Sequence, residues 1–170
     1  HDYDLYPMLP MLWHDLGSMT EKVRLDFADT VAARAEECYF KPVCQWHADR
    51  GILFGNDNCG RGRIAEGRAH YGDYFRAMRW YSAPGCDDPR LDGPRAFKGL
   101  KVNSSIAHLY RRPRVWVEAF HSSGWGVTPA DIVAAINEDF AYGATVVNLH
   151  GLYYSTRGGW WEWAPPDFHF

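Results

Sequence analysis

The sequence predicts an α/β fold, and within that class a partial (β/α)8 TIM-barrel segment with short parallel strands and intervening helices. Helical patterns alternate along the chain with short, almost continuously apolar runs, which is typical of strands buried on both faces of a parallel sheet. An open doubly wound sheet fits the same pattern, but no glycine-rich phosphate loop follows any strand. A full barrel needs about 200–250 residues, and this chain has 170. Residues 1–170 are therefore expected to form a single domain, an internal fragment of a longer barrel.

The first helical pattern covers residues 20–50. Val23, Phe27 and Val31 repeat at four-residue spacing and predict one apolar face directed at a core. Pro42 lacks a backbone N–H, so it is expected to divide this stretch into two helices or to kink one.

The remaining elements alternate. Thr128, Pro129 and Asp131 form a strong helix start, with a cap, a proline in the first turn and an acidic residue after it. The expected helices cover residues 71–81, 101–110 and 128–142, and the expected strands cover 52–54, 115–120 and 145–150. Residues 86–89 are expected to form a loop or a short strand.

Composition excludes several classes of function. The formal net charge of -3 gives no electrostatic footprint for nucleic acid, and no apolar run approaches the roughly 20 residues of a membrane span. The four cysteines lack zinc-site spacing and are expected to be free thiols. Aromatic residues make up 16% of the chain, which fits either a large core or a cleft lined with flat rings for a carbohydrate. The compartment stays undetermined.

Carboxylates at the expected strand ends are the candidates for catalysis. Glu118 stands inside a strand run, and a carboxylate there is rarely buried unless it is paired. It is either catalytic, at the carboxyl end of a parallel strand, or held in an ion pair by a neighbouring arginine. Glycoside hydrolysis requires at least two carboxyl groups that face each other across the substrate. The best partner is Asp57, with Asp87 or Asp88 in reserve.

The other polar and aromatic residues near strand ends are expected to bind the substrate. They are Asn56, Asp87, His121, Trp125, Asn148, His150, Tyr153 and Arg157. A metal-dependent hydrolase using His121, His150 and Asp57 is one alternative, although no HxH or HExxH spacing supports it. A carbohydrate-binding barrel without activity is another. The favoured interpretation requires no metal and no cofactor.

An ordered set of motifs resembles a known family. The set comprises Tyr3-Asp4-Leu5-x-Pro7-x-Leu9-Pro10, Tyr71-Gly72-Asp73-Tyr74-Phe75-Arg76-x-Met78, Ser82-Ala83-Pro84-Gly85-x-Asp87, Lys101-x-x-Ser104-Ser105-x-Ala107-His108-Leu109-Tyr110-x-Arg112-Pro113 and Val117-Glu118-Ala119-Phe120. In this order the motifs are similar to the catalytic-barrel core of the large bacterial α-L-rhamnosidase-type glycoside hydrolases and their uncharacterised relatives.

The resemblance implies a barrel segment within a much longer enzyme that uses two acidic residues, by inversion. The family's second acidic residue, in the strand after the Ser-x-Ala-His-Leu-Tyr helix, matches Glu118. The family's first acidic residue corresponds to a position near Asp57. A carbohydrate substrate and the rest of the same polypeptide are the expected partners, with no nucleic acid and no membrane.

Overall fold

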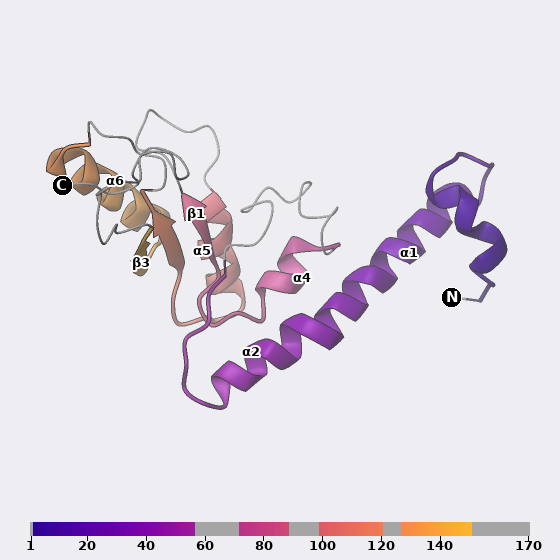
Figure 1. Cartoon of the computed structure of the whole chain (residues 1–170), viewed down its shortest axis with the longest axis horizontal. Coiled ribbons are helices and arrows are strands. Elements are labelled where there is room, and N and C mark those ends of the chain that lie inside the picture. Colours follow the sequence, from indigo (N-terminus) through magenta and orange to yellow (C-terminus); the bar gives the residue numbers. More distant parts are fainter. Residues whose placement is uncertain (1, 57–71, 89–98, 121–126, 151–170) are drawn as a thin grey trace, which may run out of the picture.

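The chain is a mixed helix and strand protein with a small parallel sheet of three strands (Figure 1). The computed structural model describes residues 2–56, 72–88, 99–120 and 127–150. In chain order the elements of these ranges are η1 (Tyr6–Leu12), α1 (Thr20–Ala35), η2 (Glu36–Phe40), α2 (Lys41–Ala48), α4 (Tyr74–Met78), β1 (Gly85–Asp88), α5 (Gly99–Leu109), β2 (Trp116–Ala119), α6 (Pro129–Tyr142) and β3 (Val146–Leu149).

The first three helical elements after η1 form one continuous long helix. η2 is a π-helical turn between α1 and α2, and it ends just before Pro42. A proline inside a regular α-helix clashes with the carbonyl four residues earlier, and a widened turn is one way to accommodate it. The predicted division near Pro42 is therefore observed as a π-helical turn that separates α1 from α2, while the backbone stays helical through it.

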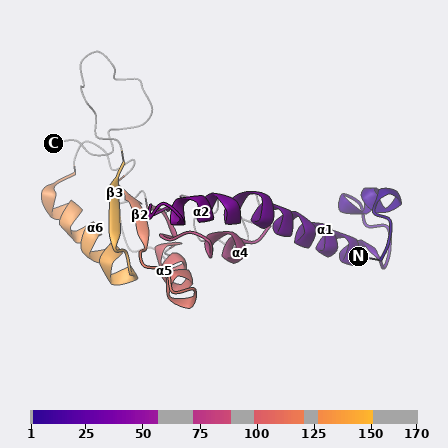
Figure 2. The ribbon, with the colours of Figure 1, turned by 90° about the horizontal axis from the view of Figure 1, so that it is seen from below.

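The sheet has the order β1-β2-β3, and each strand is parallel to its neighbour. Helix α5 lies between β1 and β2 in the sequence, and α6 lies between β2 and β3. The three strands confirm the runs expected around 86–89, 115–120 and 145–150 within one or two residues at each end. Figure 2 shows α5 and α6 beside the sheet, while α1 extends away from it.

Helix α6 begins as the sequence predicted. Thr128 and Asp131 form a reciprocal capping box, and Pro129 occupies the first turn. The helix ends at Gly143, which has a φ of 107° that other residues rarely adopt.

Two expected elements differ from the observed ones. Residues 52–54 form no strand, although the Phe54 carbonyl accepts a hydrogen bond from Ala83 N at 3.1 Å and its N–H donates to Ser82 Oγ at 2.7 Å. These two hydrogen bonds tie the segment to residues 82–83 but do not form the repeated ladder of a strand. The helix expected at 71–81 is observed only as α4, because Asp73 caps it by accepting a bond from Arg76 N at 3.0 Å.

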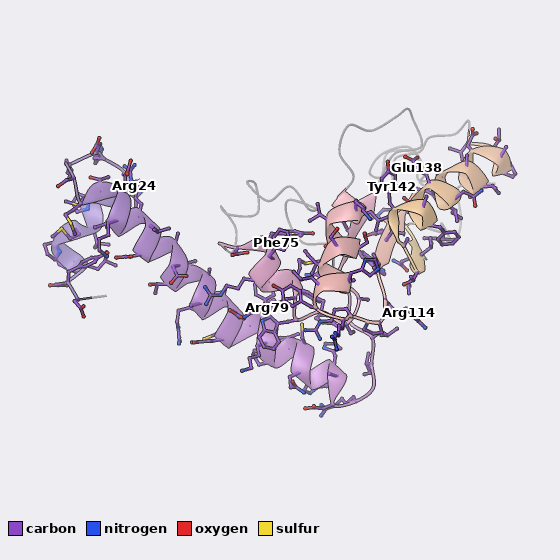
Figure 3. The ribbon with its side chains drawn as sticks, turned by 180° about the vertical axis from the view of Figure 1, so that it is seen from behind. Arg24, Phe75, Arg79, Arg114, Glu138 and Tyr142 are labelled. Atoms are coloured by element: carbon purple, nitrogen blue, oxygen red, sulfur yellow. The ribbon has the colours of Figure 1, made fainter. Side chains whose placement is uncertain are left out.

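A buried carboxylate joins α4 to the long helix. Glu36 lies in the π-helical turn and accepts hydrogen bonds from Arg76, Arg79 and Trp80, the last at 2.7 Å. Burial alone would raise the pKa of Glu36, but these three donors outweigh it and lower the pKa from 4.5 to about 2. Figure 3 shows Arg79 where α4 lies against the long helix.

In the described part of the chain, the buried apolar residues form three clusters. One joins the long helix to α4 and α5, the second lies between the sheet and α5, and the third lies beneath α6. The expected apolar face of α1 is only partly correct. Val23 is buried, but Phe27 and Val31 are 39% and 40% exposed, because this helix extends beyond the rest of the described structure.

Within the described ranges, no helix combines the length and the apolar character needed to cross a bilayer.

Candidate functional site

Three polar residues stand side by side across the sheet. Asp87 of β1 is the register partner of Glu118 of β2, and Glu118 is the register partner of Asn148 of β3. Neighbouring strands lie about 4.8 Å apart, so the carboxylates of Asp87 and Glu118 and the amide of Asn148 are close neighbours. All three belong to the carboxyl half of their strands, where the sequence placed them.

The row occupies the sheet face opposite to α5 and α6. Successive side chains of a strand point to opposite faces. The alternate positions Cys86, Val117 and Val147 pack in the clusters beneath α5 and α6. The face that carries Glu118 is therefore the one that these two helices leave uncovered, and a ligand on it would meet the polar row.

His150 follows β3 and lies close to Glu118. Its backbone N–H donates to the Ala119 carbonyl at 3.2 Å, which extends the β2–β3 ladder by one residue. Its Nε2 is 3.7 Å from Glu118 Oε1, a charge pair whenever the imidazole is protonated. At that separation the contact is weaker than a hydrogen bond. The Glu118 side chain remains 23% exposed, so a ligand has access to it.

The arginine pair considered for Glu118 is not observed among the described residues. Arg112 instead donates to the carbonyl of Arg79, and Arg114 donates to that of Pro113 at 3.1 Å. Among the described residues, the charged side chain in contact with Glu118 is that of His150. Within the described ranges, therefore, no arginine explains Glu118 as a purely structural charge.

Two further candidates in the described ranges, Asp87 and Asn56, differ in their burial and contacts. Asp87 is buried, with 6% of its surface exposed. Asn56 is half-buried and donates from Nδ2 to the Tyr81 hydroxyl at 3.1 Å. The segment before Asn56 approaches the sheet closely, since a Cβ on Gly55 would lie 2.7 Å from the Ala83 carbonyl oxygen and 3.3 Å from Trp116 Cβ.

The remaining candidates lie outside the described residues. These are Asp57, His121, Trp125, Tyr153 and Arg157. Two members of the metal-site alternative are therefore not described, and the third, His150, lies beside Glu118. In the ranges that the structure covers, no three or more His, Cys, Asp or Glu side chains gather closely enough to hold a metal ion. Cys38, Cys44 and Cys86 are free thiols, as predicted, and Cys59 is not described.

Sequence reasoning missed two residues at this site. Trp116 precedes Glu118 by two positions, so the strand alternation that placed Glu118 could also have placed Trp116 on its face. Phe120 follows β2, is 2% exposed and has a φ of 75°. A buried aromatic residue with positive φ is a strained backbone position, and no sequence signal indicates it. This strained position immediately follows the strand that carries Glu118.

Comparisons of the chain with models of known protein families, with curated proteins and with solved structures gave no match.

Proposed function

We propose that the chain is a segment of a (β/α)8 glycoside hydrolase barrel of the α-L-rhamnosidase type, and that Glu118 is one of its two catalytic carboxylates. The observation that carries the proposal is the row of Asp87, Glu118 and Asn148 at the carboxyl ends of three parallel strands. Catalytic groups of barrel enzymes come from these strand ends. The motif resemblance independently assigns the acidic role to the same Glu118.

The chemistry requires a second carboxylate. One carboxyl group protonates the leaving oxygen while the other attacks the sugar or activates water. The proposal assigns the partner role to Asp57, which directly follows Asn56 in the sequence. The described residue Gly55, two positions earlier, approaches the sheet closely. Asp87 then becomes a substrate-binding residue in the same row as Glu118.

His150 and Asn148 have supporting roles in this scheme. His150 lies 3.7 Å from Glu118 Oε1 and restricts where that carboxylate points. Asn148 neighbours Glu118 in the register and carries both a donor and an acceptor for sugar hydroxyls. His121, Trp125, Tyr153 and Arg157 are proposed to complete the contacts with the carbohydrate.

The rest of the same polypeptide is the proposed partner of the sheet. β3 is the last strand of the described sheet, and Leu149 on it is 38% exposed. An open strand edge offers unpaired backbone groups that bind a further strand. In a barrel the next strand of the same chain would occupy this edge.

The test uses the protein that contains this chain and a panel of aryl glycosides, including the α-L-rhamnoside. Glu118→Gln keeps the shape of the side chain and removes its charge. We expect kcat to fall by about 10³-fold with substrate binding retained, which is about 4 kcal/mol of transition-state stabilisation. The control is Glu21→Gln in the first turn of α1, which is exposed and should keep full activity.

Equal activity of Glu118→Gln and the unchanged protein on every cleaved glycoside would contradict the proposal. Sugar binding without turnover, unaffected by Glu118→Gln, would instead favour a binding barrel without activity. Hydrolysis abolished by a chelator and restored by one divalent ion would favour the metal-dependent alternative.

A further inference from the structure

Trp116 lies in the sheet layer next to the proposed catalytic row. Its register partners are Gly85 on β1 and Val146 on β3, two residues before Asp87 and Asn148 on their strands. Because side chains two positions apart share a face, Trp116 is on the same face as Glu118. It is one layer nearer to the amino ends of the strands.

Two glycines leave space for the side chain of Trp116. A Cβ on Gly85 would lie 2.8 Å from Trp116 Cε3 and closer still to the Trp116 carbonyl oxygen. A Cβ on Gly55 would lie 3.3 Å from Trp116 Cγ. These glycines come from different segments, one from β1 and the other from the stretch that ends at Asn56. Any larger residue at either position would collide with Trp116 or displace it.

Trp116 is nevertheless not part of the hydrophobic core. The three clusters of buried residues and their partly buried neighbours, as far as the structure describes them, do not include it. Its surface is only half-buried, whereas its strand neighbours Val115 and Val117 are buried at 4% and 0% exposure. A large aromatic residue placed next to a polar row, outside the core, is available to a ligand.

We propose that Trp116 is a substrate-binding residue whose indole stacks on the apolar face of the sugar ring bound at Glu118. The inference rests on the proposed glycoside hydrolase function and adds to it a residue that determines how the sugar is positioned. Gly55 and Gly85 pack closely against the Trp116 side chain and fix its position, and the part of the indole that stays exposed is the part proposed to meet the sugar. Hydroxyl groups on the ring edge then meet the exposed Asn148, which flanks Glu118 in the layer above.

The experiment compares Trp116→Leu, Trp116→Phe and a control, Trp13→Leu, in the protein that contains this chain. Trp13 caps the C-terminal end of η1 and is 72% exposed. For Trp116→Leu we expect KM for the best-cleaved aryl glycoside to rise about tenfold, equivalent to about 1.4 kcal/mol. We expect kcat to change much less, because the loss of a stacking contact made equally in the ground and transition states raises KM alone. Trp116→Phe keeps a flat ring and should restore most of the affinity, and Trp13→Leu should behave like the unchanged protein.

Tryptophan fluorescence supplies a readout that does not depend on turnover. The probe is the free monosaccharide released from that glycoside. Because Trp125 is also proposed to contact the sugar, the titration uses a protein that already carries Trp125→Phe, with and without Trp116→Phe. We expect the sugar to change the emission of the protein that keeps Trp116, and most of that change to be lost with Trp116→Phe although calorimetry still detects binding. This comparison decides the matter if Trp116→Leu fails to fold.

The outcomes separate this inference from the proposed function. If glycosides are cleaved but Trp116→Leu leaves KM unchanged, or the sugar-dependent emission survives in Trp116→Phe, the stacking role is overturned and the hydrolase function stands. A fall in kcat as large as the rise in KM, without rescue by phenylalanine, would make Trp116 structural and would also overturn it. If no sugar of the panel is cleaved or bound, the proposed function is wrong and the stacking role fails with it.

Discussion

Replacing Glu36 by glutamine is expected to destabilise the protein strongly at neutral pH and hardly at all at pH 2. The side chain is 8% exposed and accepts hydrogen bonds from two guanidinium groups, those of Arg76 and Arg79, and from the Trp80 indole. The depressed pKa of about 2, against an ordinary 4.5, corresponds to about 3 kcal/mol of stabilisation when the carboxylate is ionised. Glu36→Gln removes this charge while preserving the volume of the side chain.

The pH dependence follows from the direction of the pKa change. A carboxyl group with a lowered pKa in the folded state contributes its full stabilisation above its unfolded pKa, here near 4.5. That contribution declines as the pH falls from about 4.5 to about 2, where the folded protein also binds the proton. The free-energy difference between the unchanged protein and Glu36→Gln should therefore be constant from pH 5 to pH 7 and shrink below that range.

Urea unfolding followed by circular dichroism measures this difference, and Glu37 provides the matched control. Glu37 is the next residue of the same π-helical turn, but it is 63% exposed, and the ion pair that the described residues give it is with Arg34 at 3.1 Å. Exposed pairs contribute about 0–1 kcal/mol, so Glu37→Gln should cost far less than Glu36→Gln. Equal losses for the two variants, or a Glu36→Gln loss that persists unchanged at pH 2, would refute the reasoning.

Two further predictions concern the helix α6, which contacts the sheet behind Glu118. Gly143→Ala should destabilise the protein by more than about 1 kcal/mol in the same unfolding assay, because the residue has a φ of 107° and a Cβ there would lie 2.7 Å from Ser104 Cβ. The control Gly51→Ala, also at positive φ but with no atom within 4 Å of its Cβ, should cost only the backbone strain; equal losses would contradict the packing argument. Thr128→Ala removes the capping box with Asp131 and should cost about 1 kcal/mol, and an unchanged midpoint would show that the cap contributes nothing.

Local signals in the sequence predicted much of the sheet and its helices. The cap and proline at Thr128 and Pro129 fixed the start of α6 because those side chains act on their own backbone. Apolar periodicity was less informative for α1. It identified Val23 correctly, but Phe27 and Val31 are exposed, since a periodic pattern shows which face of a helix is apolar and not whether another element covers it.

The candidate site was only partly predictable for a related reason. Each of Asp87, Glu118 and Asn148 could be assigned to a strand end from its own neighbourhood in the sequence. Their alignment in one row depends on the register between strands, and register is set by packing of α5 and α6 on the other face of the sheet. The positive φ of Phe120 depends in the same way on tertiary surroundings.

The two glutamates show how the structure distinguishes a structural carboxylate from one available for chemistry. Glu36 is surrounded by two arginines and an indole, so its oxygens are occupied and its pKa is low. Glu118 receives from the described residues only the long contact of 3.7 Å to His150, and it stands in a row of polar side chains on a face that α5 and α6 leave uncovered. The Glu36 carboxylate therefore serves to hold α4 against the long helix. The Glu118 carboxylate retains lone pairs that can accept hydrogen bonds from a ligand. The same comparison predicts opposite signatures: Glu36→Gln should change stability with little effect on kcat per folded molecule, and Glu118→Gln should change kcat with little effect on stability.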